Sequence, residues 1–274
     1  MKGPKEGDHG EAELRNTALL LSYDGRPFHG WQRLRDQETV QGTLEEAIAE
    51  VFDVPSVVAG SGRTDRGAHA VGQVASTRLP LGLPSEEVVR QLNEYLQETV
   101  DGAIIVENAA NVPEDFHALH SCTGKTYRYA IWLNDELPPE YERRVWHVHG
   151  DLDLGAMAEA VPLFEGEHDF ASFASKSNFD RQGTVRWLSQ SSMFSEGPVI
   201  EMVFTGNGFL YKMVRNLVRA VVRVGEGRSS VDELASILKA KDRRKAPGSA
   251  PASGLYLDEV YYAPPVFPDE ASRR

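Results

Sequence analysis

The chain has 274 residues, 41% of them hydrophobic and 26% charged, which is the composition of a globular protein with one large or two modest cores. No apolar run approaches the about 18 residues that a membrane span needs, and the single cysteine, Cys122, excludes an internal disulfide and a metal site built from several cysteines. The formal net charge of −12 argues against general nucleic-acid binding, because contacts to phosphates need a basic surface.

The first part of the chain predicts one α+β unit. Residues 1–15 are charged and lack the apolar stretch of a signal peptide, so we expect a disordered tail and a cytoplasmic protein. The following segments predict a strand over 17–23, a helix over 40–52, strands over 57–59 and 71–77, a helix after Pro84 with Ser85 as its N-cap, and a strand over 103–106. This order is that of a ferredoxin-like or RRM-like unit.

The second part repeats this theme in its topology. It predicts a strand over 126–132, a helix over 154–164, a hairpin of strands over 185–194 and 199–205, helices over 209–224 and 231–240, and a strand over 254–262. We place the boundary near residues 108–113, which gives an N-terminal domain of residues 16–110 and a C-terminal domain of residues 111–274. The predicted fold class is α+β.

A carboxylate between two arginines is the densest candidate for chemistry. In the segment 62–70, Asp65 lies between Arg63 and Arg66, and glycines on both sides permit unusual backbone angles. A nearby arginine favours the charged form of a carboxylate, which is the form that a nucleophile needs. The same pattern also fits a surface turn with a solvated ion pair, and His69 also fits a purely structural histidine.

The predicted helix over 209–224 combines an apolar face with an adjacent basic stripe, whose members fall within about 80° of one another at 100° per residue. The stripe comprises Lys212, Arg215, Arg219 and Arg223. In an acidic protein these cations favour a contact with phosphates, although an amphipathic helix with a solvated basic face explains them as well. The basic run over 239–245 is open to the same two interpretations.

Aromatic residues stand beside basic ones in the segments 28–33 and 125–129. Aromatic rings and arginine are the groups on which flipped or single-stranded bases stack, although a tyrosine on a strand is usually part of a core. The sequence contains no Walker loop, no Gly-x-Gly-x-x-Gly turn and no His-Glu-x-x-His motif. We therefore expect no nucleotide cofactor, no other cofactor and no catalytic metal.

Taken together, these segments resemble the TruA family of tRNA pseudouridine synthases. Short matching blocks follow the family's order over residues 18–262, and eight blocks in order are far more specific than any one of them. The blocks are Tyr23-Asp24-Gly25 with Phe28-His-Gly-Trp-Gln-Arg33; Val40-Gln41-Gly-Thr-Leu44; Gly62-Arg-Thr-Asp65-Arg-Gly-Ala-His69; Phe116-His-Ala118; Lys125-Thr-Tyr127-Arg-Tyr129; Gly166-Glu-His-Asp-Phe170 with Ser172-Phe173; Gly208-Phe209-Leu-Tyr-Lys-Met-Val-Arg215-Asn216; and Gly254-Leu-Tyr-Leu257.

The resemblance implies a homodimeric isomerase that makes pseudouridine in the anticodon stem-loop of tRNA, at position 38, 39 or 40. It implies two ferredoxin-like or RRM-like halves whose antiparallel sheets meet at a basic, RNA-binding cleft. Asp65 would be the nucleophile, Tyr127 would pack on the target base, and Arg215 would pair with Asp65. Further substrate contacts are expected from Arg63, Arg66, Phe28, Trp31, Gln32, His69, His117, Lys212 and Arg219. Leu119 stands where the family usually has arginine, which removes one RNA contact that the family pattern predicts.

Two other functions fit part of the same pattern: the same isomerisation on a different RNA or tRNA position, and an RNA-binding module without catalysis. The module explains the aromatic and basic residues but not a carboxylate between arginines.

Salt adaptation reconciles the net charge with an RNA substrate. Arginine supplies 21 of the 29 basic residues, and an acidic, lysine-poor surface suits a protein hydrated in concentrated salt. We therefore expect an archaeal-like, salt-adapted member of the family.

Overall fold

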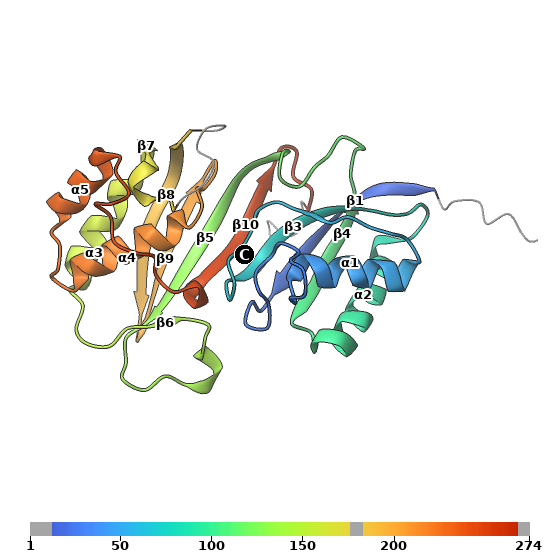
Figure 1. Cartoon of the computed structure of the whole chain (residues 1–274), viewed down its shortest axis with the longest axis horizontal. Coiled ribbons are helices and arrows are strands. Elements are labelled where there is room, and N and C mark those ends of the chain that lie inside the picture. The colour runs from blue at the N-terminus through green and yellow to red at the C-terminus, as the bar shows by residue number, and fades with distance from the viewer. Residues whose placement is uncertain (1–12, 176–182, 268–274) are drawn as a thin grey trace, which may run out of the picture.

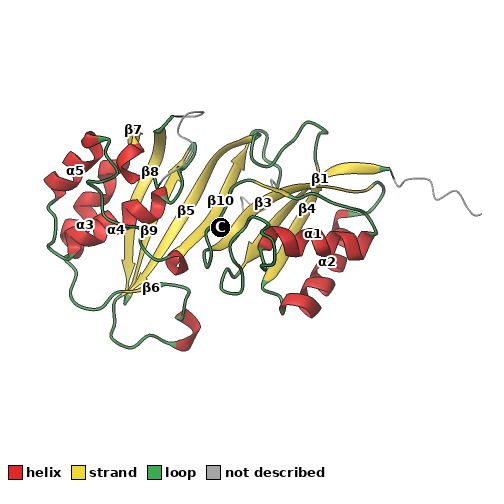
Figure 2. Ribbon diagram, in the orientation of Figure 1, coloured by secondary structure: helices red, strands yellow, loops and turns green. Residues whose placement is uncertain are grey.

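The computed structural model describes residues 13–175 and 183–267, in which one mixed sheet of ten strands runs the length of the molecule (Figure 2). The strands are β1 Leu14–Tyr23, β2 Ala59–Gly60, β3 His69–Pro80, β4 Ile104–Asn111, β5 Cys122–Trp132, β6 Trp146–His147, β7 Gly166–Asp169, β8 Val185–Glu196, β9 Val199–Gly206 and β10 Leu255–Tyr262. The α-helices are α1 Val40–Phe52, α2 Ser85–Val100, α3 Leu154–Ala160, α4 Met213–Gly225 and α5 Val231–Ala240. Short 3-10 helices lie at η1 Pro139–Tyr141, η2 Val161–Phe164, η3 Phe170–Phe173 and η5 Ala252–Gly254.

The sheet has the order β4-β1-β3-β10-β5-β9-β8-β7, with β2 paired to β3 and β6 paired to β5. The N-terminal strands therefore lie in the order β4-β1-β3-β2, and the C-terminal strands in the matching order β10-β5-β9-β8. The two groups join where β10 pairs in parallel with β3, Tyr256 opposite His69 and Leu257 opposite Ala70. The α+β class is confirmed. Apart from the short β6, the strands within each half pair antiparallel, and this parallel pairing joins the two sheets into one mixed sheet.

The helices gather at the two ends of the sheet (Figure 1). α1 and α2 pack on the N-terminal strands, α3, α4 and α5 cluster at the other end, and β10 and β5 lie between the two groups. The predicted apolar face of α4 is confirmed, because the side chains at 214, 217, 218, 221 and 222 are all buried. One large hydrophobic core runs through both halves. Among the described residues no helix has both the length and the hydrophobicity to span a bilayer.

Element bounds follow local backbone chemistry. The predicted bounds of α1 and α5 are confirmed. The expected helix over 154–164 changes to 3-10 geometry after Ala160, because Pro162 has no N–H for an α-helical bond. Ser85 is not the N-cap of α2; it is the first helical residue, and Pro84 occupies the cap without a side-chain hydrogen bond. β1 already includes Leu14 and Arg15, so the predicted tail is too long at that end, and residues 1–12 lie outside the described residues.

Candidate active site

A cavity of about 980 Å³ opens where the two halves meet, and it contains most of the predicted site residues. Residues 58–66 of the N-terminal half and residues 209–215 of the C-terminal half both contribute to its lining. The other lining residues are His29, Trp31, Gln32, Leu34, Gln41, His117, Leu119, Lys125, Tyr127 and Leu255. Asp65, Tyr127 and Arg215, which are far apart in the sequence, are thus brought to one site.

The loop that carries Asp65 is anchored by buried polar groups of the sheet. The Gln73 side chain on β3 accepts a hydrogen bond from Ser61 Oγ (2.6 Å) and donates one to the Gly62 carbonyl (2.9 Å). The Tyr23 hydroxyl at the end of β1 lies 2.8 Å from Thr64 Oγ1. Burial raises the pKa of Tyr23 to about 12, so its neutral hydroxyl is retained at physiological pH. These bonds fix the backbone on the N-terminal side of Asp65.

A second loop packs directly against the first and depends on glycine. Trp31 N–H donates to the Thr64 carbonyl at 3.1 Å. Gly30 has φ +95, and a Cβ there would lie 2.8 Å from the same carbonyl, so only glycine fits without a shift. A Cβ on Gly60 would lie 2.4 Å from the Trp31 ring, which therefore rests on that glycine. The two loops hold each other and leave the Asp65 side chain facing the cavity.

Asp65 forms an ion pair with Arg215, the third residue of α4, through Nη1 and Oδ2. Both side chains are largely shielded, with 19% of the Asp65 side chain and 12% of the Arg215 side chain exposed. Charges attract more strongly where water is mostly excluded, so this pair holds the carboxylate in one place. Arg215 Nε donates to the Ala250 carbonyl at 2.7 Å, which orients the guanidinium toward Asp65.

Tyr127 forms an aromatic wall of the cavity. It lies in the middle of β5, opposite Leu257 of β10 and Phe204 of β9, so its backbone is held on both sides. Phe209 meets its ring edge to face, with centroids 4.9 Å apart and planes at 77°. Burial raises the pKa of the Tyr127 phenol above its ordinary value, which keeps the hydroxyl protonated. The site therefore offers a neutral aromatic surface beside a carboxylate.

Cations dominate the rest of the lining. They are Arg63, Arg66, Lys125, Lys212 and Arg215, against the single carboxylate of Asp65. Within residues 13–175 and 183–267, only Arg215 of these five cations is in an ion pair. Lys125 is 9% exposed, with its Nζ 3.3 Å from Cys122 Sγ. A cavity with unpaired cations in a protein of net charge −12 is suited to a polyanion.

Nine of the predicted site residues line this cavity, and three do not. The nine are Asp65, Tyr127, Arg215, Arg63, Arg66, Trp31, Gln32, His117 and Lys212. Phe28 is 1% exposed and belongs to the core. His69 accepts a hydrogen bond from Gly25 N–H (3.1 Å), lies 3.2 Å from the Arg143 carbonyl and stacks on Tyr256, so its contacts are structural.

Arg219 also lies outside the cavity lining, which divides the predicted basic stripe. Its guanidinium pairs with Glu226 at 2.9 Å and lies 5.4 Å from the centroid of the Trp146 ring. Arg223 donates to the Arg228 carbonyl at 3.4 Å. Of the stripe, only Lys212 and Arg215 line the cavity, so the closeness of the four cations around the predicted helix does not indicate a shared role.

The predicted site residues did not include Phe209, Leu210 and Tyr211, because this segment was expected to be helical. The helix starts only at Met213, since Lys212 adopts φ 58, a left-handed conformation that an α-helix excludes. The residues before it instead line the cavity, and Tyr211 is 50% exposed there, with Lys212 Nζ 5.1 Å from its ring centroid. The aromatic and basic run over 209–212 was the available signal. His29, Leu34, Lys125 and Leu119 are further lining residues outside the predicted contacts.

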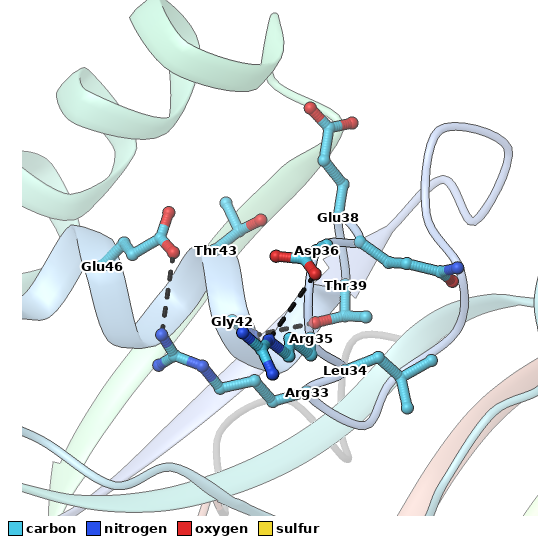
Figure 3. Close-up of a pocket in the computed structure, with 10 residues that line it drawn as sticks. Arg33, Leu34, Arg35, Asp36, Glu38, Thr39, Gly42, Thr43 and Glu46 are labelled. Atoms are coloured by element: carbon cyan, nitrogen blue, oxygen red, sulfur yellow. Dashed lines mark hydrogen bonds and ion pairs between the residues drawn. The ribbon is translucent and has the colours of Figure 1, made fainter.

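A second cavity of about 660 Å³ lies beside the loop 33–39 and the start of α1 (Figure 3). Its two arginines are already engaged by carboxylates. Arg33 lies 2.7 Å from Glu45 and 3.9 Å from Glu46, and Arg35 lies 3.6 Å from the neighbouring Asp36. Because the cations here are neutralised, this cavity is poorly suited to phosphate, in contrast to the main one.

The sequence is similar to proteins described as tRNA pseudouridine synthases. Residues 160–263 match the family model described as tRNA pseudouridine synthase. The tRNA pseudouridine synthase A of Methylacidiphilum infernorum is 42% identical over 246 residues, which cover 90% of this chain and 95% of that protein. The protein of the same name from Acetivibrio thermocellus is 38% identical over 250 residues, which cover 91% of this chain and 100% of that protein. That of Solidesulfovibrio magneticus is 42% identical over 262 residues, with coverages of 92% and 93%.

Proposed function

The chain belongs to the tRNA pseudouridine synthase family, and from this membership we propose that it converts uridine to pseudouridine in tRNA with Asp65 as nucleophile. The observation that carries the assignment is the Asp65 carboxylate, held by Arg215 in a cavity whose other charged residues are cations. A cavity that binds RNA only through its phosphates gains nothing from a carboxylate, since a carboxylate repels phosphate. The carboxylate therefore favours the enzyme over the non-catalytic RNA-binding module.

The chemistry requires no net oxidation and no added group. The bond between the sugar C1′ and uracil N1 breaks, the base turns, and a new bond forms between C1′ and C5. C5 loses its proton, N1 gains one, and the product is an isomer of the substrate. In this scheme Asp65 supplies the nucleophile, Arg215 holds it in position, and Tyr127 packs on the base while it turns. The target uridine must leave its stack to reach Asp65, and the unpaired cations hold the flanking phosphates.

The finer points of the proposal rest on the family resemblance. We propose that the targets are uridines at positions 38, 39 or 40 of the anticodon stem-loop and that the enzyme acts as a homodimer in the cytoplasm. We also propose ferredoxin-like halves with a boundary between residues 110 and 111. The matching strand orders β4-β1-β3-β2 and β10-β5-β9-β8 support these halves, and the boundary falls one residue before the end of β4.

Mapping pseudouridine in total tRNA from cells with and without the gene for this chain tests the assignment. We expect pseudouridine at positions 38 to 40 to be lost on deletion and restored by the purified protein acting on the unmodified tRNA. Loss at other tRNA positions or in another RNA would support the isomerase but move its target. An unchanged map together with tRNA binding would favour the binding module. The molar mass of the purified protein, measured by analytical ultracentrifugation, tests whether it is a dimer.

Tyr211 is expected to stack on a base next to the target uridine, because its ring is half exposed at the cavity. Replacing it with alanine should raise KM roughly tenfold, since stacking is worth about 1–3 kcal/mol per base, while phenylalanine should preserve KM. Phe194 on β8 is the matched control, because this residue is 57% exposed and lies outside the cavity lining. Steady-state kinetics on tRNA measure both. Equal effects of alanine at 211 and 194 would contradict the stacking role.

The net charge of −12 leads to a prediction about salt. We propose that the protein is salt-adapted, with acidic residues facing solvent and cations gathered in the cavity. Its melting temperature should rise steadily from ~0.1 to ~3 M potassium chloride, because salt screens repulsion between surface carboxylates. Salt also weakens phosphate contacts, so tRNA affinity should fall less steeply than the number of cavity cations implies. A melting temperature that stays flat or falls over this range contradicts salt adaptation and leaves the catalytic proposal untouched.

A further inference from the structure

The segment 249–251 lies against α4 and holds Arg215 at two points. Ala250 is fully buried; its N–H donates to the main-chain carbonyl of Arg215 at 3.0 Å, and its own carbonyl accepts from Arg215 Nε at 2.7 Å. With Nε engaged there, the guanidinium presents Nη1 to Asp65. The direction of the catalytic ion pair is therefore set by one backbone carbonyl, in a segment that does not itself line the cavity.

The same segment is fastened on both sides of Ala250. Before it, Ser249 Oγ donates to Asn216 Oδ1 at 2.6 Å. After it, the Pro251 carbonyl accepts from the Tyr129 hydroxyl at 2.7 Å. Asn216, the residue after Arg215, is completely buried. Its amide nitrogen donates to the Phe173 carbonyl at 2.5 Å. This bond holds the Asn216 side chain in place independently of its hydrogen bond with Ser249.

We propose that the Ser249 hydroxyl is a positioning group for the reaction: through Asn216 it fixes the Ala250 carbonyl, which in turn aims Arg215 at Asp65. The inference rests on the proposed role of Asp65 and Arg215. Ser249 does not line the cavity and does not contact the reacting atoms in this scheme. It therefore acts on Arg215 indirectly, by holding the backbone of the next residue, Ala250. Small displacements of a catalytic pair reduce the rate of the chemical step more than they reduce binding.

Ser249→Ala and Ser249→Thr test the hydroxyl, and Ser253→Ala is a matched control. Ser253 lies in the same connection to β10, is half-buried as Ser249 is, and donates one hydrogen bond, to the Val145 carbonyl at 3.1 Å. We expect Ser249→Ala to lower kcat roughly tenfold with KM within about twofold of wild type. Ser249→Thr should restore kcat to within about twofold, because the hydroxyl is retained, and Ser253→Ala should leave kcat and KM unchanged.

Hydrogen exchange at Arg215 Nε–H, followed by NMR, gives a readout that does not depend on activity. It should be slow in wild type, Ser249→Thr and Ser253→Ala, and faster in Ser249→Ala. An unchanged kcat and exchange rate in Ser249→Ala would overturn the proposal, and so would equal losses in Ser253→Ala. If the wild type makes no pseudouridine, the proposed function fails; the exchange measurement then still decides whether Ser249 holds Arg215.

Discussion

Replacement of Asp65 by asparagine or alanine is expected to abolish pseudouridine formation while tRNA affinity stays within about tenfold of wild type, or ~1.4 kcal/mol. The carboxylate is the nucleophile of the proposed reaction, whereas affinity comes mainly from contacts between phosphates and the unpaired cations of the cavity. Removal of a negative charge also lessens repulsion of the RNA, so affinity is not expected to fall steeply. Single-turnover assays and filter binding on the same tRNA separate the two quantities.

Asp36→Asn provides the matched control for this variant. Asp36 lies in the loop beside the second cavity, with its side chain 88% exposed, and its φ of 58 is one that asparagine adopts readily. The same change from carboxylate to amide should leave turnover unaltered there. Retained turnover in Asp65→Ala would refute the role of Asp65. A melting curve must accompany each variant, because Asp65→Ala leaves the largely shielded Arg215 without its partner.

The parts of the fold that were predictable are those governed by local pattern. Helical spacing of apolar residues gave the bounds of α1 and α5, because burial of one face and capping both act within a few residues. The continuous sheet was not predictable in this way. It depends on β3 and β10 pairing at only two positions each, between segments distant in the sequence, and periodicity within a strand carries no information about such a partner.

The site residues show the same difference between local pattern, which was predictable, and contacts between distant segments, which were not. Asp65 and its flanking arginines are adjacent in sequence, so the residues alone single them out, whereas the pairing of Arg215 with Asp65 came from the family resemblance. Its motif left His69 open to a structural role or a substrate contact, and the structure buries its ring against Tyr256, outside the cavity lining. The Ala250 carbonyl is a backbone group, so no side-chain pattern marks it.

Arg215→Ala is expected to lower kcat by about 10²-fold while KM changes less than tenfold, because the arginine holds the nucleophile and contributes little to total phosphate attraction. Arg215→Lys should be intermediate. Lysine keeps the charge but lacks the fork that lets arginine bond the Ala250 carbonyl through Nε and Asp65 through Nη1 at once. Rapid-quench measurement of the chemical step, alongside equilibrium binding, resolves these two effects.

Arg219→Ala and Arg63→Ala distinguish the proposed role of Arg215 in holding the nucleophile from a contribution to stability and from a simple phosphate contact. Arg219 lies on the same helix but pairs with Glu226 and rests on Trp146, so its loss should lower the melting temperature and leave kcat and KM within about twofold. Arg63 is exposed at the cavity without an ion pair among the described residues, so its loss should raise KM with kcat at saturation unchanged. If all three alanine variants behave alike, Arg215 is a general phosphate contact and the ion pair with Asp65 has no special part in the reaction.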